Sequence, residues 1–247
     1  MVKLTIDGIQ VEAEKGTSIL HAAESVGIEV PTLCYIKDLL PDGSCRMCMV
    51  EIESRGRTKM ETACTAQVAE GLVVTTNSEK VRNARRNILD MLLSNHKTDC
   101  FSCPSNGDCK LQELCFEYGI ERTTYSGEQT ELPIDDSNKF FTYNPNLCIL
   151  CHRCVNTCHK IVGRGAIDTM ERGFDSAIGT PFHIDWADTN CESCGNCVQA
   201  CPTGALTMKR RKNYRKYQID KKVLTTCPHC ATGCQYYLLV KDNKIVD

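Results

Sequence analysis

The sequence predicts an α+β protein built from several small domains that metal stabilises. Three observations favour this class: strand and helix patterns alternate near the N-terminus, amphipathic helical spacing follows, and 19 of the 247 residues are cysteines. Small domains bury too little apolar surface to be stable alone, so they commonly need metal or disulfide staples. The cysteine count is odd and many cysteines form C-x-x-C pairs, whose members rarely bond each other, so metal is favoured over disulfides.

The first predicted domain covers residues 1–77. Residues 2–13 alternate around Asp7-Gly8, a strong hairpin signal. Thr17 is predicted to cap a helix that Gly27 ends. A hairpin, a helix and then further strands predict a small mixed sheet with a helix packed across it, the β-grasp arrangement. The further strand-like runs are 48–53, 58–64 and 72–76.

The second predicted segment, 78–120, is helical. Ser78 is expected to cap a helix that ends near Asn95, which leaves His96 in an irregular segment. The apolar face of this helix is predicted at Val81, Ala84, Ile88, Met91 and Leu92. A shorter helix is expected over 109–118, with a buried face formed by Leu111, Leu114, Cys115 and Tyr118. We interpret Cys115 as a buried free cysteine.

The rest of the chain divides by composition. A polar, turn-rich stretch predicts a linker over 121–139, and a third domain follows over 140–208. The basic run 209–222 is interpreted as a solvated linker, with a docking strip for an acidic partner chain as the alternative. The last segment, 223–247, is a short tail with a hairpin expected around Lys241-Asp242-Asn243.

The strongest signal is a repeated cysteine run with the spacing C-x2-C-x2-C-x3-C, in which every cysteine recurs 43 residues later. This is the bacterial two-[4Fe–4S] ferredoxin pattern, in which the fourth cysteine of each run ligates the other cluster. Zinc prefers two separated pairs in a tetrahedron, so clusters are favoured. The predicted ligands of one cluster are Cys148, Cys151, Cys154 and Cys201, and those of the other are Cys191, Cys194, Cys197 and Cys158.

Three further sets of donors are less specific. His96, Cys100, Cys103 and Cys109 suit either zinc or a [4Fe–4S] cluster with one histidine corner. Cys34, Cys45, Cys48 and Cys64 fit the plant-type [2Fe–2S] motif only loosely, because their first interval is wide; Gly43 gives the backbone room beside Cys45. The tail carries a C-x2-C-x3-C run at Cys227, Cys230 and Cys234.

The order of these motifs resembles the N-terminal region shared by the large iron–sulfur subunit of bacterial complex I, NAD-dependent formate dehydrogenase α subunits and [FeFe] hydrogenase catalytic subunits. The stretches that carry the resemblance are "LCYIKDLLPDGSCRMCMVEI", "HKTDCFSCPSNGDCKLQ", "NPNLCILCHRCVNTC" and "CESCGNCVQACPTGAL". The resemblance implies a [2Fe–2S] cluster on Cys34, Cys45, Cys48 and Cys64, and a histidine-ligated [4Fe–4S] cluster on His96, Cys100, Cys103 and Cys109. His152 stands where relatives commonly have glycine.

The tail resembles the start of the catalytic domain of formate dehydrogenases, where the same cysteine spacing and a later cysteine hold another [4Fe–4S] cluster. Three explanations stay open for Cys227, Cys230 and Cys234. A partner subunit or another ligand completes a cluster, the motif binds zinc with His229 nearby, or it is a remnant.

The sequence predicts a non-catalytic electron-transfer subunit. It has no dinucleotide fingerprint after a strand, no phosphate loop and no apparent nucleophile–base pair. We expect one [2Fe–2S] and three [4Fe–4S] clusters that relay electrons between a flavin and NAD(H)-binding subunit and a catalytic or acceptor subunit of an NAD(P)(H)-linked complex. Formate dehydrogenase is the first choice of complex, ahead of hydrogenase and electron-bifurcating enzymes. The alternatives are a free-standing multi-cluster ferredoxin and a zinc-stapled interaction module.

Charge and hydropathy limit where the protein is expected to be located and which partners it is expected to bind. The N-terminus lacks a basic region followed by an apolar core, and no apolar run approaches the roughly 20 residues of a membrane helix. We therefore expect a soluble cytoplasmic protein with reduced thiols and no membrane span. A formal charge of −2 gives no reason to expect nucleic acid as a partner.

Overall fold

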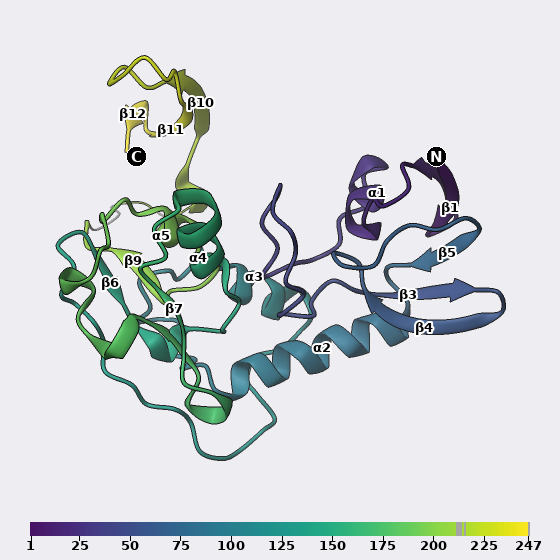
Figure 1. Cartoon of the computed structure of the whole chain (residues 1–247), viewed down its shortest axis with the longest axis horizontal. Coiled ribbons are helices and arrows are strands. Elements are labelled where there is room, and N and C mark those ends of the chain that lie inside the picture. Colours follow the sequence, from purple (N-terminus) through teal and green to yellow (C-terminus); the bar gives the residue numbers. More distant parts are fainter. Residues whose placement is uncertain (211–213, 215, 247) are drawn as a thin grey trace.

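The computed structural model describes residues 1–210, 214 and 216–246. In Figure 1 the N-terminal sheet lies at one end of the molecule, and the long helix α2 (Glu79–Ser94) runs from beneath it toward the region between β6 (Phe141–Tyr143) and β9 (Leu206–Met208), which we call the ferredoxin-like region. A small C-terminal sheet projects beyond α4 (Arg153–Asn156) and α5 (Asn196–Ala200) (Figure 1). Within the described residues, no helix combines the length and apolar character that crossing a membrane requires.

The N-terminal sheet is mixed and has five strands in the order β2-β1-β5-β3-β4. β1 and β5 are parallel, and the other neighbours are antiparallel. Helix α1 (Ile19–Ser25) packs its buried residues into the same core as the sheet. The predicted mixed sheet with a helix across it is therefore confirmed. The strands are β1 (Val2–Ile6), β2 (Ile9–Ala13), β3 (Met49–Ser54), β4 (Arg57–Thr62) and β5 (Leu72–Thr75).

The turn predictions for this domain are confirmed, but the helix cap was misplaced by one residue. Asp7 and Gly8 have φ of 46° and 84°, as the tight hairpin requires. The cap of α1 is Ser18, whose side-chain oxygen accepts a hydrogen bond from the backbone N–H of His21. Thr17 instead uses its carbonyl oxygen to accept from the Val68 backbone N–H at 2.9 Å, which keeps it outside the helix.

Helix α2 (Glu79–Ser94) begins at the predicted cap, Ser78, and ends at Asn95. Its predicted apolar face was partly right. Val81 is buried, and Ile88 and Leu92 pack against the core. Met91, however, is 53% exposed, and the other buried residues are Arg85, Leu89 and Leu93.

Arg85 accounts for the rotated face of α2. Its guanidinium donates to the Tyr118 hydroxyl at 3.0 Å and to the Met49 carbonyl at 2.8 Å. These bonds stabilise the buried Arg85 cation, which a prediction from hydrophobicity alone would place on the exposed face of the helix.

Helix α3 (Lys110–Glu117) confirms the predicted short helix. Leu111, Leu114 and Cys115 are buried along it, and Tyr118 is buried at its end. Cys115 lies in one apolar cluster with Leu89 and Cys34, so this helix packs between α2 and the N-terminal domain. The segment expected as a linker, 121–139, is pinned to its neighbours: the Thr123 hydroxyl donates to Asp90 at 2.7 Å.

The ferredoxin-like region is built from short elements. β6 (Phe141–Tyr143) pairs with β9 (Leu206–Met208), which brings the two ends of the region together. Helices α4 (Arg153–Asn156) and α5 (Asn196–Ala200) contact each other, and a π-helical turn (Thr157–Val162) extends α4. The 3₁₀ turn Pro145–Leu147 precedes α4. Between α4 and α5 lie β7 (Asp168–Met170), β8 (Ala177–Gly179) and the 3₁₀ turns Gly173–Asp175, Pro181–His183 and Trp186–Asp188.

The C-terminal sheet has the order β10-β11-β12, with strands β10 (Lys221–Thr226), β11 (Gln235–Lys241) and β12 (Lys244–Ile245). The predicted hairpin at Asp242-Asn243 is confirmed, since both residues have positive φ. β10 was not predicted, because its lysines continue the basic run while its backbone pairs with β11. A 3₁₀ turn (Lys216–Gln218) precedes it. Residues 211–213 and 215 of the basic run lie outside the described residues.

Candidate metal centres

Two cavities in the ferredoxin-like region are lined by cysteines from both repeats. The first is lined by Cys148, Cys151, Cys154 and Cys201, and we call it the central cavity. The second is lined by Cys158, Cys191, Cys194 and Cys197, and we call it the distal cavity. Each run therefore provides three cysteines to one cavity and its last cysteine to the other. These are the same two groups that the repeat predicts.

The backbone of each run curls around its sulfurs in the same way. Leu150 and Ser193 occupy equivalent places before the second cysteine of their runs, with φ of 50° and 55°. Their backbone N–H groups donate to Cys148 and Cys191 sulfurs, in both cases at 3.4 Å. Such bonds favour a negatively charged sulfur, as a thiolate ligand requires.

His152 also adopts a left-handed conformation, with φ of 59°. This region favours glycine, the residue that the resemblance leads us to expect at this place. The imidazole lines the central cavity, and its Nε2 lies 3.3 Å from the Thr169 hydroxyl. The histidine therefore adds a polar wall to the central cavity where a glycine would leave space.

The central cavity is an unfavourable place for metal-free thiolates. Burial raises the pKa of Cys148 to about 11 and that of Cys151 to about 12. The pKa of Cys154 also rises well above its usual value, first through burial and then through the neighbouring sulfurs. Soft sulfur donors gathered away from water suit an iron–sulfur cluster, because the metal supplies the missing positive charge.

His96, Cys100, Cys103 and Cys109 line a third cavity. His96 directly follows the end of α2, and Cys109 occupies the N-cap position of α3. Burial lowers the pKa of His96 to about 4, so its imidazole is neutral near pH 7, as metal ligation requires. Its buried Nδ1 has no hydrogen-bond partner among the described residues. An orphaned imidazole nitrogen beside three thiols fits a metal or cluster ligand.

This histidine-containing cavity is packed tightly against the central cavity. The backbone N–H of Lys110 donates to the Pro202 carbonyl at 2.9 Å, next to Cys201. A Cβ atom added at Gly204 would lie 2.6 Å from the Cys103 sulfur. Glycine is therefore needed at this position for close approach of the two sites.

The remaining four predicted ligands in the N-terminal domain are all buried: Cys34, Cys45, Cys48 and Cys64. The Cys48 and Cys64 sulfurs are 3.3 Å apart. A hydrogen bond shared with Cys45 lowers the pKa of Cys34 to about 5, and one shared with Cys64 lowers that of Cys48 to about 7. The same bonds raise the pKa of Cys45 and Cys64. Four buried thiols that share protons in pairs form a donor set suited to a cluster.

The approach of the chain to these cysteines uses Gly43. This residue has φ of 65°, and a Cβ atom built on it would lie 3.1 Å from the Thr65 methyl group, next to Cys64. The backbone at Gly43 therefore passes close to the segment that carries Cys64, in the space that the sequence analysis expected a glycine to leave.

Arg153 joins this N-terminal site to the central cavity. Its guanidinium donates to the Tyr35 carbonyl, next to Cys34, and to the Ala200 carbonyl, next to Cys201, both at 2.6 Å. Cys34, Cys45 and Cys151 share one apolar cluster. Sequence reasoning missed Arg153 and Gly204, because their roles depend on contacts between distant segments.

The tail cysteines occupy a loop and line none of the cavities described above. The loop joins β10 to β11, and the Cys227 N–H donates to the Cys234 carbonyl at 2.8 Å. Cys230 and Cys234 are exposed. Hydrogen bonding by Thr232 lowers the pKa of Cys230. Across the described part of the chain, no three His, Cys, Asp or Glu side chains are grouped closely enough to hold a single metal ion.

Four family models match successive segments. They are described as a 2Fe-2S iron-sulfur cluster binding domain (residues 1–79), an NADH-ubiquinone oxidoreductase-G iron-sulfur binding region (85–124), an NADH-quinone oxidoreductase subunit 3 ferredoxin-like domain (140–207) and a 4Fe-4S dicluster domain (190–237). Together with the cysteine-lined cavities, these matches define the class: an iron–sulfur protein with 2Fe-2S and 4Fe-4S ferredoxin-like domains of mixed helix and sheet content.

Comparisons with whole proteins narrow the class. The chain is 42% identical to an NADH-quinone oxidoreductase subunit of Rhizobium meliloti (strain 1021), over 95% of this chain and 27% of the relative. It is 43% identical to the NADPH-Fe(3+) oxidoreductase subunit alpha of Geobacter sulfurreducens, over 99% of this chain and 28% of the relative. The chain thus spans little more than a quarter of the length of these curated relatives.

A solved structure matches over most of its own length. One chain in the crystal structure of an NAD+-reducing [NiFe]-hydrogenase in the H2-reduced state superposes with a TM-score of 0.78 and 30% identity, covering 85% of this chain and 88% of that chain. The chain belongs to the family of iron–sulfur subunits of NAD(P)H-linked oxidoreductases. The resemblance of the sequence to iron–sulfur subunits of complex I and hydrogenases is confirmed.

Proposed function

We propose that this chain is a multi-cluster electron-transfer subunit of a cytoplasmic NAD(P)(H)-linked oxidoreductase complex. It relays electrons between a flavin and NAD(H)-binding subunit and a catalytic or acceptor subunit, in a hetero-oligomer. The observation that carries the proposal is the gathering of sixteen donor side chains into four groups, three of which lie against the fourth, the central cavity. The names of the relatives, which are subunits of NADH, NADPH and hydrogenase enzymes, support it.

The proposed ligand sets follow these groups. When bound, the clusters supply one-electron redox chemistry that side chains alone lack. One [2Fe–2S] cluster is assigned to Cys34, Cys45, Cys48 and Cys64. Three [4Fe–4S] clusters are assigned to His96, Cys100, Cys103 and Cys109; to Cys148, Cys151, Cys154 and Cys201; and to Cys191, Cys194, Cys197 and Cys158.

The proposed domains are those expected from the sequence. Residues 1–77 form a β-grasp domain, 78–120 the helical histidine-containing segment, 121–139 a linker and 140–208 a bacterial-type two-cluster domain. A basic linker (209–222) and the cysteine-containing tail (223–247) complete the chain. The mixed five-stranded sheet with α1 in its core supports the first assignment.

The route through the chain follows from contacts that its own residues make. Arg153 holds the Cys34 segment against the central cavity, and the Ser44 hydroxyl donates to the Cys151 carbonyl at 3.4 Å. On another side, Gly204 lets the Cys103 sulfur approach the central cavity. The central cavity thus contacts the N-terminal, histidine-containing and distal sites. We propose that electrons entering at the N-terminal site pass first to it.

We propose the class of the catalytic partner from the cysteine spacing in the tail. Its C-x2-C-x3-C run favours formate dehydrogenase, whereas the named relatives include quinone-linked, Fe(3+)-linked and hydrogenase enzymes. We propose that Cys227, Cys230 and Cys234 contribute to a further [4Fe–4S] or zinc site, completed by a ligand outside this loop. The open position of the loop leaves access for such a ligand.

Anaerobic isolation tests the main proposal. Iron and acid-labile sulfide assays should find at least about fourteen irons per chain, from one two-iron and three four-iron centres. NADH should reduce these centres only when the flavin subunit is present. A colourless zinc protein without sulfide would instead identify an interaction module. A monomer that exchanges electrons with several enzymes without forming a stable complex would identify a free-standing ferredoxin.

A further inference from the structure

One short strand contributes an aromatic side chain to each of the two ferredoxin cavities. Phe141 and Tyr143 lie two residues apart on β6, so their side chains point to the same face. Phe141 lines the distal cavity and Tyr143 lines the central cavity. The ring of Trp186 packs against both, with centroid separations of 5.3 Å in each case. The two cavities therefore share one aromatic wall that differs by a single hydroxyl group.

That hydroxyl group is buried without an ordinary partner. Tyr143 is 5% exposed, and its oxygen has no hydrogen-bond partner among the described residues. An unpaired buried hydroxyl is unfavourable, so an acceptor is expected nearby. The cavity that Tyr143 lines is also lined by the four cysteines assigned to its cluster, and a cluster-bound sulfur is a hydrogen-bond acceptor.

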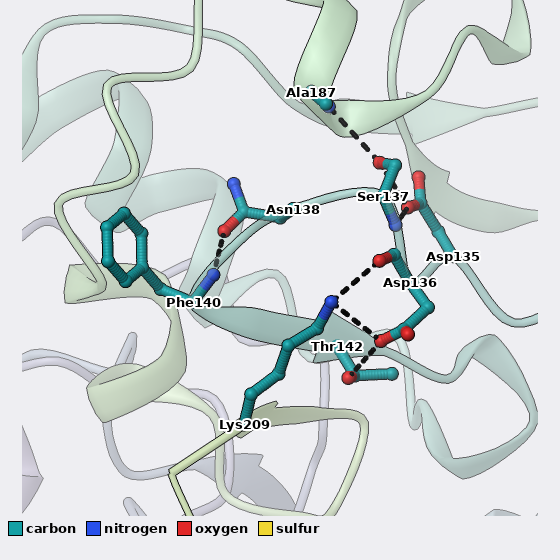
Figure 2. Close-up of polar contacts among 8 residues, drawn as sticks. All are labelled: Asp135, Asp136, Ser137, Asn138, Phe140, Thr142, Ala187 and Lys209. Carbon is teal, nitrogen blue, oxygen red and sulfur yellow. Dashed lines mark hydrogen bonds and ion pairs between the residues drawn. The ribbon is translucent and has the colours of Figure 1, made fainter.

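Polar contacts fix the strand that carries these rings. Backbone bonds of 2.9 Å join Tyr143 and Asp135 in both directions. The Lys209 ammonium donates to the carbonyl of Asp136 at 2.7 Å and pairs with its carboxylate at 3.1 Å, where the Thr142 hydroxyl also donates (Figure 2). This framework holds the β6 backbone in place, and the stacked Trp186 ring packs against the Tyr143 ring that β6 carries.

The same framework positions the third ring. An Asp135 carboxylate oxygen accepts from the backbone N–H of Trp186 at 3.0 Å. The Ser137 hydroxyl oxygen accepts from the Ala187 N–H at 3.2 Å, and the Ser137 side chain is in turn bonded to Asp135 (Figure 2). The segment before β6 therefore fixes both the strand and the tryptophan that packs on it.

We propose that, when the central cavity holds its cluster, the Tyr143 hydroxyl donates a hydrogen bond to one of the cluster's cysteine sulfurs and thereby raises the reduction potential of that cluster. Reduction adds negative charge to the cluster and its sulfurs, so a donor to sulfur stabilises the reduced form more than the oxidised form. Phe141 provides no such donor in the distal cavity. The inference rests on the proposed function only in requiring a [4Fe–4S] cluster at each cavity. Tyr143 is a positioning residue, and its hydrogen bond favours the reduced state of the cluster in the central cavity.

Potentiometric titration of the anaerobically isolated protein, followed by electron paramagnetic resonance, tests the inference. Tyr143→Phe keeps the ring and removes the donor. We expect it to lower the reduction equilibrium constant of one cubane about tenfold, which is about 59 mV for one electron. The other cubane should keep its potential. Tyr118→Phe is the matched control, because it removes a buried hydroxyl that Arg85 binds outside both cavities.

A second variant keeps the inference testable if Tyr143→Phe does not retain its cluster. Replacement of Tyr143 by 3-fluorotyrosine keeps the ring and strengthens the phenol as a donor, so the potential of the same cubane should rise. The inference is overturned if Tyr143→Phe changes the equilibrium constant by less than twofold, or equally at both cubanes. If Tyr143→Phe does not hold its cluster, an unchanged potential in the fluorotyrosine protein overturns it. Wild-type protein without [4Fe–4S] signals would instead overturn the proposed function.

Discussion

The central cavity and the tail loop begin from similar sequence patterns and end as different structures. Both carry three closely spaced cysteines. In the central cavity the chain returns to add Cys201, and helices and strands exclude water from the sulfurs. In the tail the cysteines lie in the loop between β10 and β11, where Cys230 and Cys234 face solvent. Spacing alone therefore indicates metal chemistry, whereas enclosure depends on what the rest of the chain packs around the loop.

The two regions also differ in the protonation of their thiols. Burial raises the pKa of Cys151 to about 12, so a proton stays on the sulfur until a metal replaces it. In the tail, hydrogen bonding by Thr232 lowers the pKa of Cys230 and outweighs the small opposing effect of burial. The buried cysteines of the central cavity therefore become thiolates only when a metal binds, whereas hydrogen bonding favours the thiolate of Cys230 in the tail loop without one.

Removal of one ligand should produce the largest difference between the regions. Cys154→Ser takes a buried sulfur from the central cavity and should reduce the iron content by about four atoms, with a clear fall in thermal stability. Cys230→Ser should leave at least about fourteen irons in place. Iron assays and thermal unfolding of the two purified variants measure this. Equal iron loss in both variants would show that enclosure does not separate the sites.

Crowding the wall between two cavities should have the next largest effect. Gly204→Ala places a methyl group 2.6 Å from the Cys103 sulfur. We expect a loss of about 1–3 kcal/mol in unfolding free energy from overpacking, with a perturbed spectrum of the histidine-ligated centre. Gly127→Ala is the control, because its added carbon has no atom within 4 Å. Chemical denaturation and electron paramagnetic resonance distinguish the two; indistinguishable variants would contradict the tight packing.

Loosening the contact between two sites should have a moderate effect. Arg153→Gln removes the bonds to the Tyr35 and Ala200 carbonyls. We expect a loss of about 1–3 kcal/mol in stability and a weaker magnetic interaction between the reduced N-terminal and central clusters. Arg153→Lys can keep one of the two bonds and should show a smaller change. A full interaction in Arg153→Gln would mean that apolar packing alone holds these sites together.

Thiol reactivity should give the smallest and most local difference. In chain prepared without iron, iodoacetamide should modify Cys230 at a lower pH than an ordinary thiol, because the thiolate is the nucleophile and its pKa is lowered. Thr232→Val should slow that reaction several-fold near pH 7. Cys154, with its raised pKa and burial, should react only after denaturation. Peptide mass spectrometry follows each site, and early labelling of Cys154 would contradict the described enclosure.

The regular elements were largely predictable because their signals are local. Asp7-Gly8 specifies a hairpin and Ser78 a helix start, and both are found in the structure. The exceptions arise from tertiary contacts. Thr17 fails as a cap because Val68 occupies its carbonyl oxygen, and the buried face of α2 is rotated because Arg85 finds polar partners in β3 and at the end of α3.

The candidate sites were predictable to the level of donor sets, and not beyond it. The constant displacement between the two cysteine runs indicates which residues act together, and the structure groups the same sulfurs around each cavity. The hydroxyl of Tyr143, the bridge through Arg153 and the close approach at Gly204 depend on segments far apart in the chain. No spacing rule reports such contacts, so sequence alone did not find them.

The position of the central cavity has a consequence for the wiring of the molecule. It contacts the N-terminal, histidine-containing and distal sites through Arg153, Gly204 and the paired α4 and α5 helices. A linear series of carriers stops transferring electrons when any member is lost. A central carrier with three neighbours can still transfer electrons when one of those neighbours is lost. With the proposed ligand sets, loss of either the N-terminal or the histidine-containing cluster leaves the other as an entry point for electrons. Such a loss therefore lowers the rate of electron transfer through the protein without stopping it.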